Sequence, residues 1–287
     1  MEVYEIRPFG FCQGVNQAFL IARSAKKENP NLEVYVLGMI VHNEDAVESL
    51  ASEGFKILDE RKALLSKLLD DIPNGQVVVF SAHGHPQNLE TIAKKKRLLI
   101  YDATCRYVTE NLVSALKAVQ EHAVIYIGVR GHLECEAFLS NCPKAILYDV
   151  GNDSFECGGI TDAEPFVVSQ TTLSYLEIEK AHHAILSRFP AAVFGPERCH
   201  STTLRQKAMS DLPSGVDVVI VLGSERSNNS LKLAQIAMNQ GCETHLVLDL
   251  SSLKKIDLTK KRKVAIASGA STSRETFEAC VQYLRSL

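Results

Sequence analysis

The sequence predicts an α/β fold made of three related α/β units, with small and mainly parallel sheets, about a pseudo-threefold axis. Two observations predict this fold. Cys12, Cys105 and Cys199 are separated by 93 and 94 residues, which is close to a third of the 287-residue chain. Each cysteine also lies between a short apolar stretch, typical of a strand, and a helical pattern. We therefore expect units at residues 1–104, 105–198 and 199–287.

The elements around the three cysteines follow one order. Apolar strands are expected before them, at residues 3–6, 98–101 and 192–194. Apolar side chains three and four residues apart predict helices after them, over residues 15–22, 108–119 and 204–212. The first helix stops at Asn29-Pro30 and the third at Pro213, because proline cannot continue a helix.

Three further strands are expected in each unit. Runs rich in β-branched residues predict buried strands at residues 34–37, 123–127 and 216–222, each ending next to a glycine. A second set is expected at residues 55–58, 145–148 and 245–248. The last set, at residues 77–80, 166–168 and 264–267, leads into small or polar residues. Strands that alternate with helical stretches are typical of βα units in parallel sheets.

Polar side chains follow these strands in the same register in all three units. Ligands of parallel sheets bind beyond the carboxyl ends of the strands, so these side chains are expected to face one site. The set contains imidazoles, an amide and hydroxyls, but no lysine or arginine: His42, His83, His132, Ser227, Asn229 and Ser271. Together with N–H groups at helix starts they predict an anion pocket, although each alone would fit a capping or core role. Glu134 is placed to transfer protons beside a metal.

Eight cysteines in a chain whose N-terminus lacks an apolar signal core predict a reducing, cytoplasmic compartment. One cysteine from each unit, at a strand-to-helix turn, favours three thiolates that meet. Such a trio fits a 4Fe–4S cluster in which one iron has no protein ligand, or a zinc ion with an open position. The other cysteines are expected to be small buried apolar residues: Cys135, Cys142, Cys157, Cys242 and Cys280.

Composition excludes several classes of function. Hydrophobic residues make up 46% of the chain, charged residues 23%, and the net charge is −3. Without a basic excess we expect no nucleic-acid partner. The apolar runs are too short to cross a membrane, so no membrane partner is expected. The chain has neither a Walker A loop nor a G-x-G-x-x-G motif, which leaves nucleotide-binding folds without support.

A series of motifs runs through nearly the whole chain. Those of the first part are Gly10-Phe11-Cys12-x-Gly14-Val15, Val41-His42-Asn43, Ser81-Ala82-His83-Gly84 and Asp102-Ala103-Thr104-Cys105. Those of the remainder are Gly131-His132-x-Glu134, Ser169-Gln170-Thr171-Thr172, Cys199 with Thr202-Thr203-x-Arg205-Gln206, Gly223-Ser224, Ser227-x-Asn229-Ser230 and Gly269-Ala270-Ser271. In this order they resemble the motifs of the 4-hydroxy-3-methylbut-2-enyl diphosphate reductases, the IspH or LytB family.

The resemblance implies a trefoil of the three units around a 4Fe–4S cluster held by Cys12, Cys105 and Cys199. It implies that a polar set holds the substrate diphosphate, with Asn228 standing where the family usually has a serine: His42, His83, Ser227, Asn228, Asn229 and Ser271. His132 would also face the substrate, near its hydroxyl and diphosphate. Glu134 and Thr171 would order a proton relay at that hydroxyl.

The implied reaction is a reductive dehydroxylation with two electrons and two protons. It converts an allylic diphosphate to isopentenyl and dimethylallyl diphosphates plus water, the last step of the non-mevalonate pathway. A ferredoxin or flavodoxin would donate the electrons, and both a monomer and a homodimer stay open.

Three alternatives stay open beside this hypothesis. They are a zinc-dependent hydrolase or lyase that uses the same cysteines, a diverged diphosphate-binding paralogue, and a noncatalytic three-repeat scaffold. The chain also departs from the family at Leu133, where proline is usual, and at Ala137, where glycine is usual. These two changes predict a different shape for the loop that carries His132 and Glu134.

Overall fold

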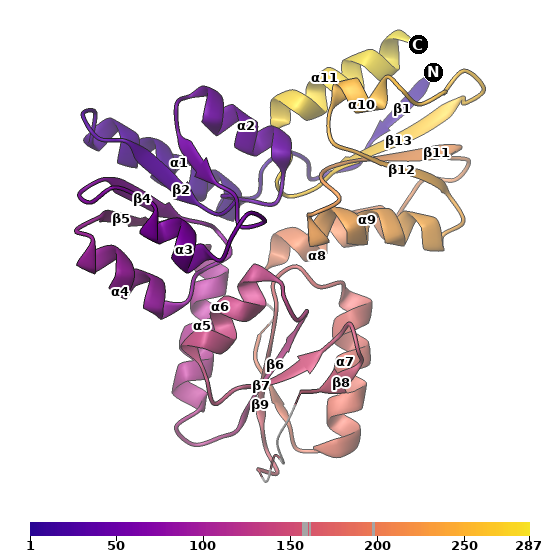
Figure 1. Cartoon of the computed structure of the whole chain (residues 1–287). Helices are drawn as coiled ribbons and strands as arrows, with labels where there is room; N and C mark the ends of the chain where they lie inside the picture. Colours follow the sequence, from indigo (N-terminus) through magenta and orange to yellow (C-terminus); the bar gives the residue numbers. More distant parts are fainter. Residues whose placement is uncertain (157–159, 161, 197–198) are drawn as a thin grey trace. The chain divides into compact units, whose positions relative to one another are not determined.

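The chain folds into two compact units. Figure 1 shows the helices and strands of the computed structural model. The structure describes residues 1–156, 160, 162–196 and 199–287. The first unit comprises Met1–Asn16, Val41–Gly54 and His200–Leu287. The second unit comprises Gln17–Ile40 and Phe55–Cys199. Helix α1 (Gln13–Glu28) begins in the first unit and continues into the second.

The first unit is built on one parallel sheet of four strands, in the order β1-β13-β11-β12. The strands are β1 (Glu2–Glu5), β13 (Lys263–Ser268), β11 (Val218–Leu222) and β12 (Glu243–Val247). Side chains alternate between the two faces, so each face buries a separate core. Phe277 belongs to one core and Leu233 to the other. The helices are α2 (Glu44–Ser52), α8 (His200–Ser210), α9 (Asn228–Asn239), α10 (Leu250–Leu253) and α11 (Arg274–Ser286).

The second unit contains two sheets, of which the first has the order β3-β2-β4-β5 and is parallel throughout. Its strands are β3 (Lys56–Leu58), β2 (Val34–Leu37), β4 (Val77–Phe80) and β5 (Leu99–Asp102). Helices α3 (Leu65–Asp70) and α4 (Gln87–Lys95) place Leu69 and Leu89 against Phe80 in the core.

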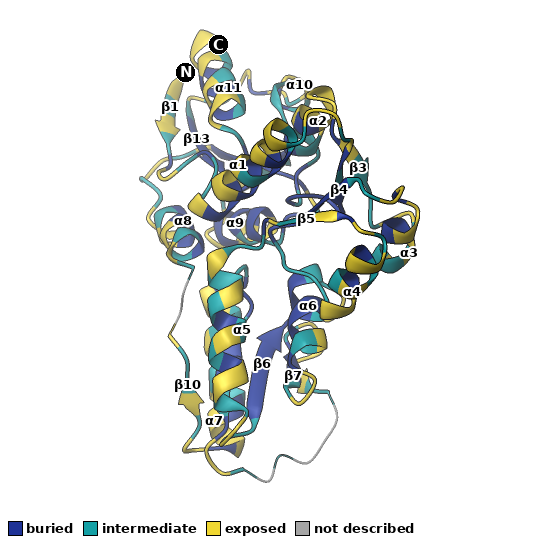
Figure 2. Ribbon diagram, turned by 90° about the vertical axis from the view of Figure 1, so that its left-hand side faces the viewer, coloured by how far each residue is buried: buried dark blue, intermediate teal, exposed yellow. Residues whose placement is uncertain are grey.

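The second sheet of this unit has the order β10-β9-β6-β7-β8. Its strands are β10 (Val193–Phe194), β9 (Phe166–Ser169), β6 (Val124–Gly128), β7 (Ile146–Asp149) and β8 (Ser154–Phe155). The helices are α5 (Arg106–Ala118), α6 (Leu133–Asn141) and α7 (Tyr175–Arg188). Strand β6 is buried along its whole length, whereas α5 exposes one face (Figure 2). The short β8 pairs antiparallel with β7 and was not predicted from the sequence.

The α/β class and the small, mainly parallel sheets are confirmed. Every predicted strand is present, and most of their ends lie within one or two residues of the expected positions. The three sheets contain β2–β5, β6–β10, and β1 with β11–β13. The division at residues 1–104, 105–198 and 199–287 stays a prediction. Among the described residues, no helix is both long enough and apolar enough to cross a membrane.

Candidate active site

Each predicted metal ligand lies between the edge strand of a sheet and the start of a helix. Cys12 follows β1 and directly precedes α1, where its sulfur accepts a hydrogen bond from the Val15 N–H (3.4 Å). Cys105 follows β5 and is the N-cap residue of α5. Cys199 follows β10 and directly precedes α8. The N-terminus of a helix favours a thiolate, so the local geometry of all three suits metal binding.

The Cys105 turn packs against the loop that follows β4. The Cys105 N–H donates to the Ala82 carbonyl at 3.0 Å. Gly84 in this loop has a φ of +84°, and a Cβ there would lie 3.4 Å from Val108 and 3.5 Å from Ala137. Glycine is favoured at Gly84 because that φ is unfavourable for other residues. His83 is thereby held on a short loop that contacts the Cys105 turn.

Glu134 is a buried carboxyl group fixed by Thr171. It lies in the first turn of α6 and is only 2% exposed. One carboxylate oxygen accepts the Thr171 backbone N–H and the other accepts the Thr171 hydroxyl, both at 2.8 Å. Gln170 holds the Thr171 loop by accepting the Val129 N–H (3.0 Å) and donating to the Thr172 hydroxyl (2.9 Å). The loops after β6 and β9 therefore meet at this carboxyl group.

Burial raises the pKa of Glu134 to about 7, because loss of water around the carboxylate outweighs the hydrogen bonds from Thr171, which lower it. The folded protein therefore binds this proton more tightly than the unfolded chain, whose glutamate pKa is 4.5. The resulting stabilisation is fully present below pH 4.5 and is lost as the pH rises through about 7.

His132 begins the helix that carries Glu134. It is the N-cap residue of α6, and its Nδ1 accepts the Glu134 N–H at 3.2 Å. A ring nitrogen that accepts has no proton, so a neutral His132 carries its proton on Nε2. The His83 ring packs edge-on against His132 with centroids 5.9 Å apart. Leu133 and Ala137 lie inside a regular α6, so the two departures from the family leave the helix intact.

Thr171 and Cys199 line the same small cavity. Asn111 on α5 also lines it, and donates from its amide to the Ser169 carbonyl at 2.9 Å. This bond ties the helix that starts at Cys105 to the strand that leads to Thr171. Within the second unit, the structure therefore connects Cys105, Cys199, Thr171 and Glu134 through neighbouring loops.

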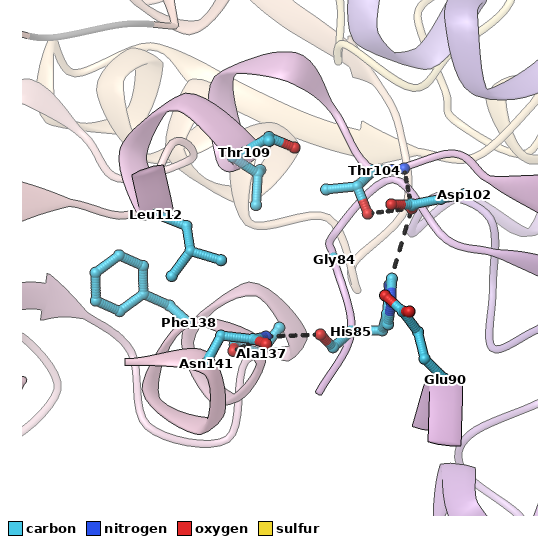
Figure 3. Close-up of a pocket in the computed structure, with 11 residues that line it drawn as sticks. Gly84, His85, Glu90, Asp102, Thr104, Thr109, Leu112, Ala137, Phe138 and Asn141 are labelled. Atoms are coloured by element: carbon cyan, nitrogen blue, oxygen red, sulfur yellow. Dashed lines mark hydrogen bonds and ion pairs between the residues drawn. The ribbon is translucent and has the colours of Figure 1, made fainter. Parts of the chain in front are cut away.

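A larger cavity of the same unit is lined by Asp102 and Thr104, which precede Cys105 in the chain (Figure 3). Asp102 in its wall accepts the Thr104 N–H at 2.9 Å and so shapes the turn before Cys105. Asn141 on α6 donates to the His85 carbonyl at 2.8 Å, and the His85 ring stacks on Phe80. None of the predicted site residues lines this cavity, so we interpret its polar side chains as supports of the loop.

The first unit contains a set of buried polar groups that have no partner among the described residues. Both side-chain atoms of Asn229 and the Ser271 hydroxyl belong to it, as does the amide nitrogen of Asn43. These side chains are at most 6% exposed. Ser227 caps α9 by accepting the Ser230 N–H, which leaves Asn228 as the first residue of the helix. Buried polar groups are normally hydrogen-bonded, so this set points to a polar ligand.

Two glycines let the Ser230 side chain approach the ends of β11 and β13. A Cβ at Gly223 would lie 2.1 Å from the Ser230 hydroxyl oxygen, and a Cβ at Gly269 would lie 2.2 Å from it. Neither position tolerates a side chain, so the N-terminal turn of α9 lies directly on the two strand ends. This packing brings the first turn of α9, which carries Asn229, next to the loop after β13, which carries Ser271.

The Cys12 turn joins this polar region. The Cys12 N–H donates to the Ala270 carbonyl at 2.9 Å, next to Ser271. The Ser268 hydroxyl accepts the Gly10 N–H (3.0 Å), and Arg205 donates to the Gly10 carbonyl (2.6 Å). His42 lies in the same unit, directly before Asn43 and the α2 helix that Asn43 caps.

The predicted residues are divided between the units. The first contains Cys12, His42, Ser227, Asn228, Asn229 and Ser271, and the second contains Cys105, Cys199, His83, His132, Glu134 and Thr171. Among the described residues, neither unit alone brings three His, Cys, Asp or Glu side chains together for a metal ion.

Sequence reasoning missed two buried polar residues, Asn43 at the start of α2 and Tyr126 in β6, although Asn43 stands in a quoted motif. Of the remaining cysteines, Cys135, Cys142 and Cys280 are buried as predicted and Cys242 is half-buried. Cys157 lies outside the described residues.

The fold and the candidate site together define a class: an α/β enzyme in which three thiols and a buried carboxyl group follow the carboxyl ends of parallel strands. Residues 3–285 match the family model described as "LytB protein". The chain therefore belongs to the LytB family.

Named relatives agree with this assignment. The chain is 34% identical over 279 residues to the 4-hydroxy-3-methylbut-2-enyl diphosphate reductase of Malacoplasma penetrans, covering 95% of this chain and 93% of the relative. It is 35% identical over 289 residues to that of Bacillus cytotoxicus, covering 99% and 90%. A solved E-1-hydroxy-2-methyl-but-2-enyl-4-diphosphate reductase from Plasmodium falciparum superposes with a TM-score of 0.87 at 29% identity, covering 99% of this chain and 87% of that one.

Proposed function

We propose that this chain catalyses the reductive dehydroxylation of 4-hydroxy-3-methylbut-2-enyl diphosphate. Two electrons and two protons break the allylic C–O bond and give isopentenyl and dimethylallyl diphosphates plus one water. The observation that carries the proposal is the position of Thr171. It binds the Glu134 carboxyl group and also lines a cavity with Cys199, so a proton donor and a metal ligand serve one site.

Cys12, Cys105 and Cys199 would hold a 4Fe–4S cluster. Three thiolates at helix N-termini fit such a cluster because the helix ends favour the ionised sulfur. When bound, the cluster would supply the electrons and an iron without a protein ligand, which acts as a Lewis acid on the allylic oxygen.

The polar groups of the strand ends would bind the diphosphate. His42, His83, His132, Thr171, Ser227, Asn228, Asn229 and Ser271 are the residues that we assign to substrate binding. The unpartnered atoms of Asn229 and Ser271 support this role, because diphosphate oxygens would satisfy buried donors. The diphosphate is remote from the breaking bond, so its binding energy serves to orient the reacting carbon.

Glu134 would protonate the departing oxygen, since hydroxide is a poor leaving group. With a pKa of about 7 it is about half protonated at neutral pH, so the acid form is well populated and can still release its proton. The two hydrogen bonds from Thr171 fix the carboxyl group and favour the carboxylate that remains after transfer.

A one-electron carrier such as a ferredoxin or flavodoxin would reduce the cluster. The eight cysteines agree with a reducing, cytoplasmic compartment. The chain would work as a monomer or a homodimer.

The decisive experiment is anaerobic purification, iron counting, and assay with the hydroxylated C5 diphosphate and a chemical reductant. We expect a brown protein with about four irons per chain that forms both C5 diphosphates. A colourless, zinc-loaded protein would favour a hydrolase or lyase. Iron-replete protein without product would favour a paralogue that only binds diphosphates.

The rate is expected to fall at alkaline pH. Because Glu134 acts in its protonated form and has a pKa of about 7, kcat should be constant at acidic pH and fall tenfold per unit above about pH 7. The measurement is kcat at saturating substrate from about pH 5.5 to 9 with excess reductant. A flat profile up to pH 9 would contradict the assigned role of Glu134.

Replacing Asn229 by alanine is expected to weaken diphosphate binding by about 10–100-fold, the usual worth of hydrogen bonds to a charged group. The dissociation constant for inorganic diphosphate provides the measurement, with KM for the substrate as a second value. Asn239→Ala is the matched control, because Asn239 lies exposed at the other end of α9 and binds only Gln235 in the hydrogen bonds described. If both variants bound inorganic diphosphate with equal affinity, Asn229 would not be a diphosphate-binding residue.

A further inference from the structure

Tyr126 is a buried tyrosine directly beneath the helix that carries Glu134. It lies in the middle of β6 and is 1% exposed. Its ring stacks on Phe138 of α6, with centroids 3.9 Å apart and 16° between the planes. The ring is therefore clamped between the sheet and α6, and few orientations are open to its hydroxyl.

Gly128 makes room for this ring. A Cβ at Gly128 would lie 2.7 Å from the Tyr126 Cε1 and 3.2 Å from the Cys135 sulfur. Tyr126 and Gly128 are two residues apart on one strand, so they face the same side of the sheet. The tyrosine ring leans along β6 over Gly128, toward the end of the strand where His132 and Glu134 follow.

The Tyr126 hydroxyl has no hydrogen-bond partner among the described residues, although its oxygen is inaccessible to water. An unpartnered buried hydroxyl destabilises a fold, and phenylalanine would fill the same space without that cost. Among the charged groups that act on this hydroxyl, the Glu134 carboxylate has the largest effect. Each Glu134 oxygen accepts one bond from Thr171 and has a lone pair left for a second donor.

We propose that the Tyr126 hydroxyl is a positioning group, which donates a hydrogen bond to the Glu134 carboxylate once Glu134 has given up its proton. This inference rests on the role of Glu134 in the proposed function. The Glu134 carboxylate would then accept three hydrogen bonds, from the Thr171 N–H, the Thr171 hydroxyl and the Tyr126 hydroxyl. The protonated acid would accept fewer.

The surrounding charges agree with a donor role. The titratable groups that act on the hydroxyl are Glu134 and Cys135, both of α6. The pKa of Tyr126 lies well above 10, because burial raises it and the charges of Glu134 and Cys135 raise it further. The Tyr126 hydroxyl therefore remains protonated. Burial raises the pKa of Cys135 to about 12, which keeps that thiol neutral. The contact with Tyr126 lowers the pKa of Glu134 against the effect of burial.

Tyr126→Phe tests the proposal by infrared titration of the Glu134 carboxyl band in the purified holoprotein. The band is assigned by its loss in Glu134→Gln. We expect the midpoint of Glu134 titration to rise by about one pH unit in Tyr126→Phe, and the alkaline limb of kcat to move by the same amount. At a pH well below the Glu134 pKa of about 7, where the Tyr126 hydroxyl has no carboxylate partner, we also expect the thermal midpoint to rise by about 2 °C, because an unpartnered hydroxyl is removed.

Tyr148→Phe is the matched control. Tyr148 lies in the neighbouring strand β7, is equally buried, and already donates its hydroxyl to Asp153 at 2.5 Å. Its replacement should leave the Glu134 midpoint unchanged and lower the thermal midpoint. An unchanged or lowered Glu134 midpoint in Tyr126→Phe would overturn the proposal. The infrared midpoint requires no turnover, so failure of the proposed reaction would be seen separately, as an inactive wild-type enzyme.

Discussion

Cys199→Ser is expected to lose its bound iron and to fall to background reductase activity. Serine keeps the shape of the side chain but replaces a thiolate by a hydroxyl, which stays protonated near neutral pH and is a poor ligand for iron. With only Cys12 and Cys105 left, two protein ligands cannot retain the cluster. The measurements are iron and sulfide per chain, the visible spectrum, and turnover, all made without oxygen.

Cys242→Ser is the control for this substitution. Cys242 is half-buried, packs beside the core that includes Leu233 and Ala237, and donates its N–H to the Ala237 carbonyl near the end of α9. It should keep full iron content and activity. If Cys199→Ser also retained both, the three-thiolate centre would be wrong and the noncatalytic scaffold would regain support.

Glu134→Gln is expected to lower kcat by about 100–10,000-fold, the usual contribution of a positioned general acid. The amide fills the space of the carboxyl group and can still bind Thr171 through its oxygen, but it carries no proton that it can release to the leaving oxygen. Binding of the substrate should change little, because we assign the diphosphate contacts to other residues. Single-turnover rates and the dissociation constant of the substrate separate the two effects.

Glu136→Gln provides the comparison two residues along the same helix. The Glu136 side chain is 42% exposed, accepts the Gly131 N–H (2.8 Å) and pairs with Arg130. We expect kcat to stay within a few-fold of wild type in this variant, because surface ion pairs contribute little. Equal losses in both variants would assign the effect to the structure of α6 rather than to proton transfer.

The fold was largely predictable because its strands are short, apolar and rich in β-branched residues. The run at Val218–Leu222 is buried along its whole length, as its composition indicates. Strand β8 was not predictable, since two residues, Ser154 and Phe155, carry no alternation. The sequence also did not predict which strands pair in each sheet. Strand β1 pairs with β13 from the far end of the chain, and the spacing of strands along the sequence does not indicate such a partner.

The candidate site was predictable to a similar degree. The position of each cysteine at a helix start follows from the order of strand and helix, and the structure confirms it. The bond between Glu134 and Thr171 joins residues 37 positions apart, so only the resemblance to a family pointed to it. Tyr126 gave no signal, because a tyrosine in a strand is ordinary and only its burial distinguishes it.

The pairing of β1 with β13 has a consequence for how the chain is made on the ribosome. Glu2 and Tyr4 emerge first, yet they dock on Lys263 and Ala265, which are translated near the end. The loop bearing Cys12 also depends on Ser268 and Ala270 for its shape. The loops of Cys105 and Cys199 can therefore fold during synthesis, whereas the loop of Cys12 has to wait for the end of the chain. The proposed cluster would accordingly be completed only after translation is nearly finished.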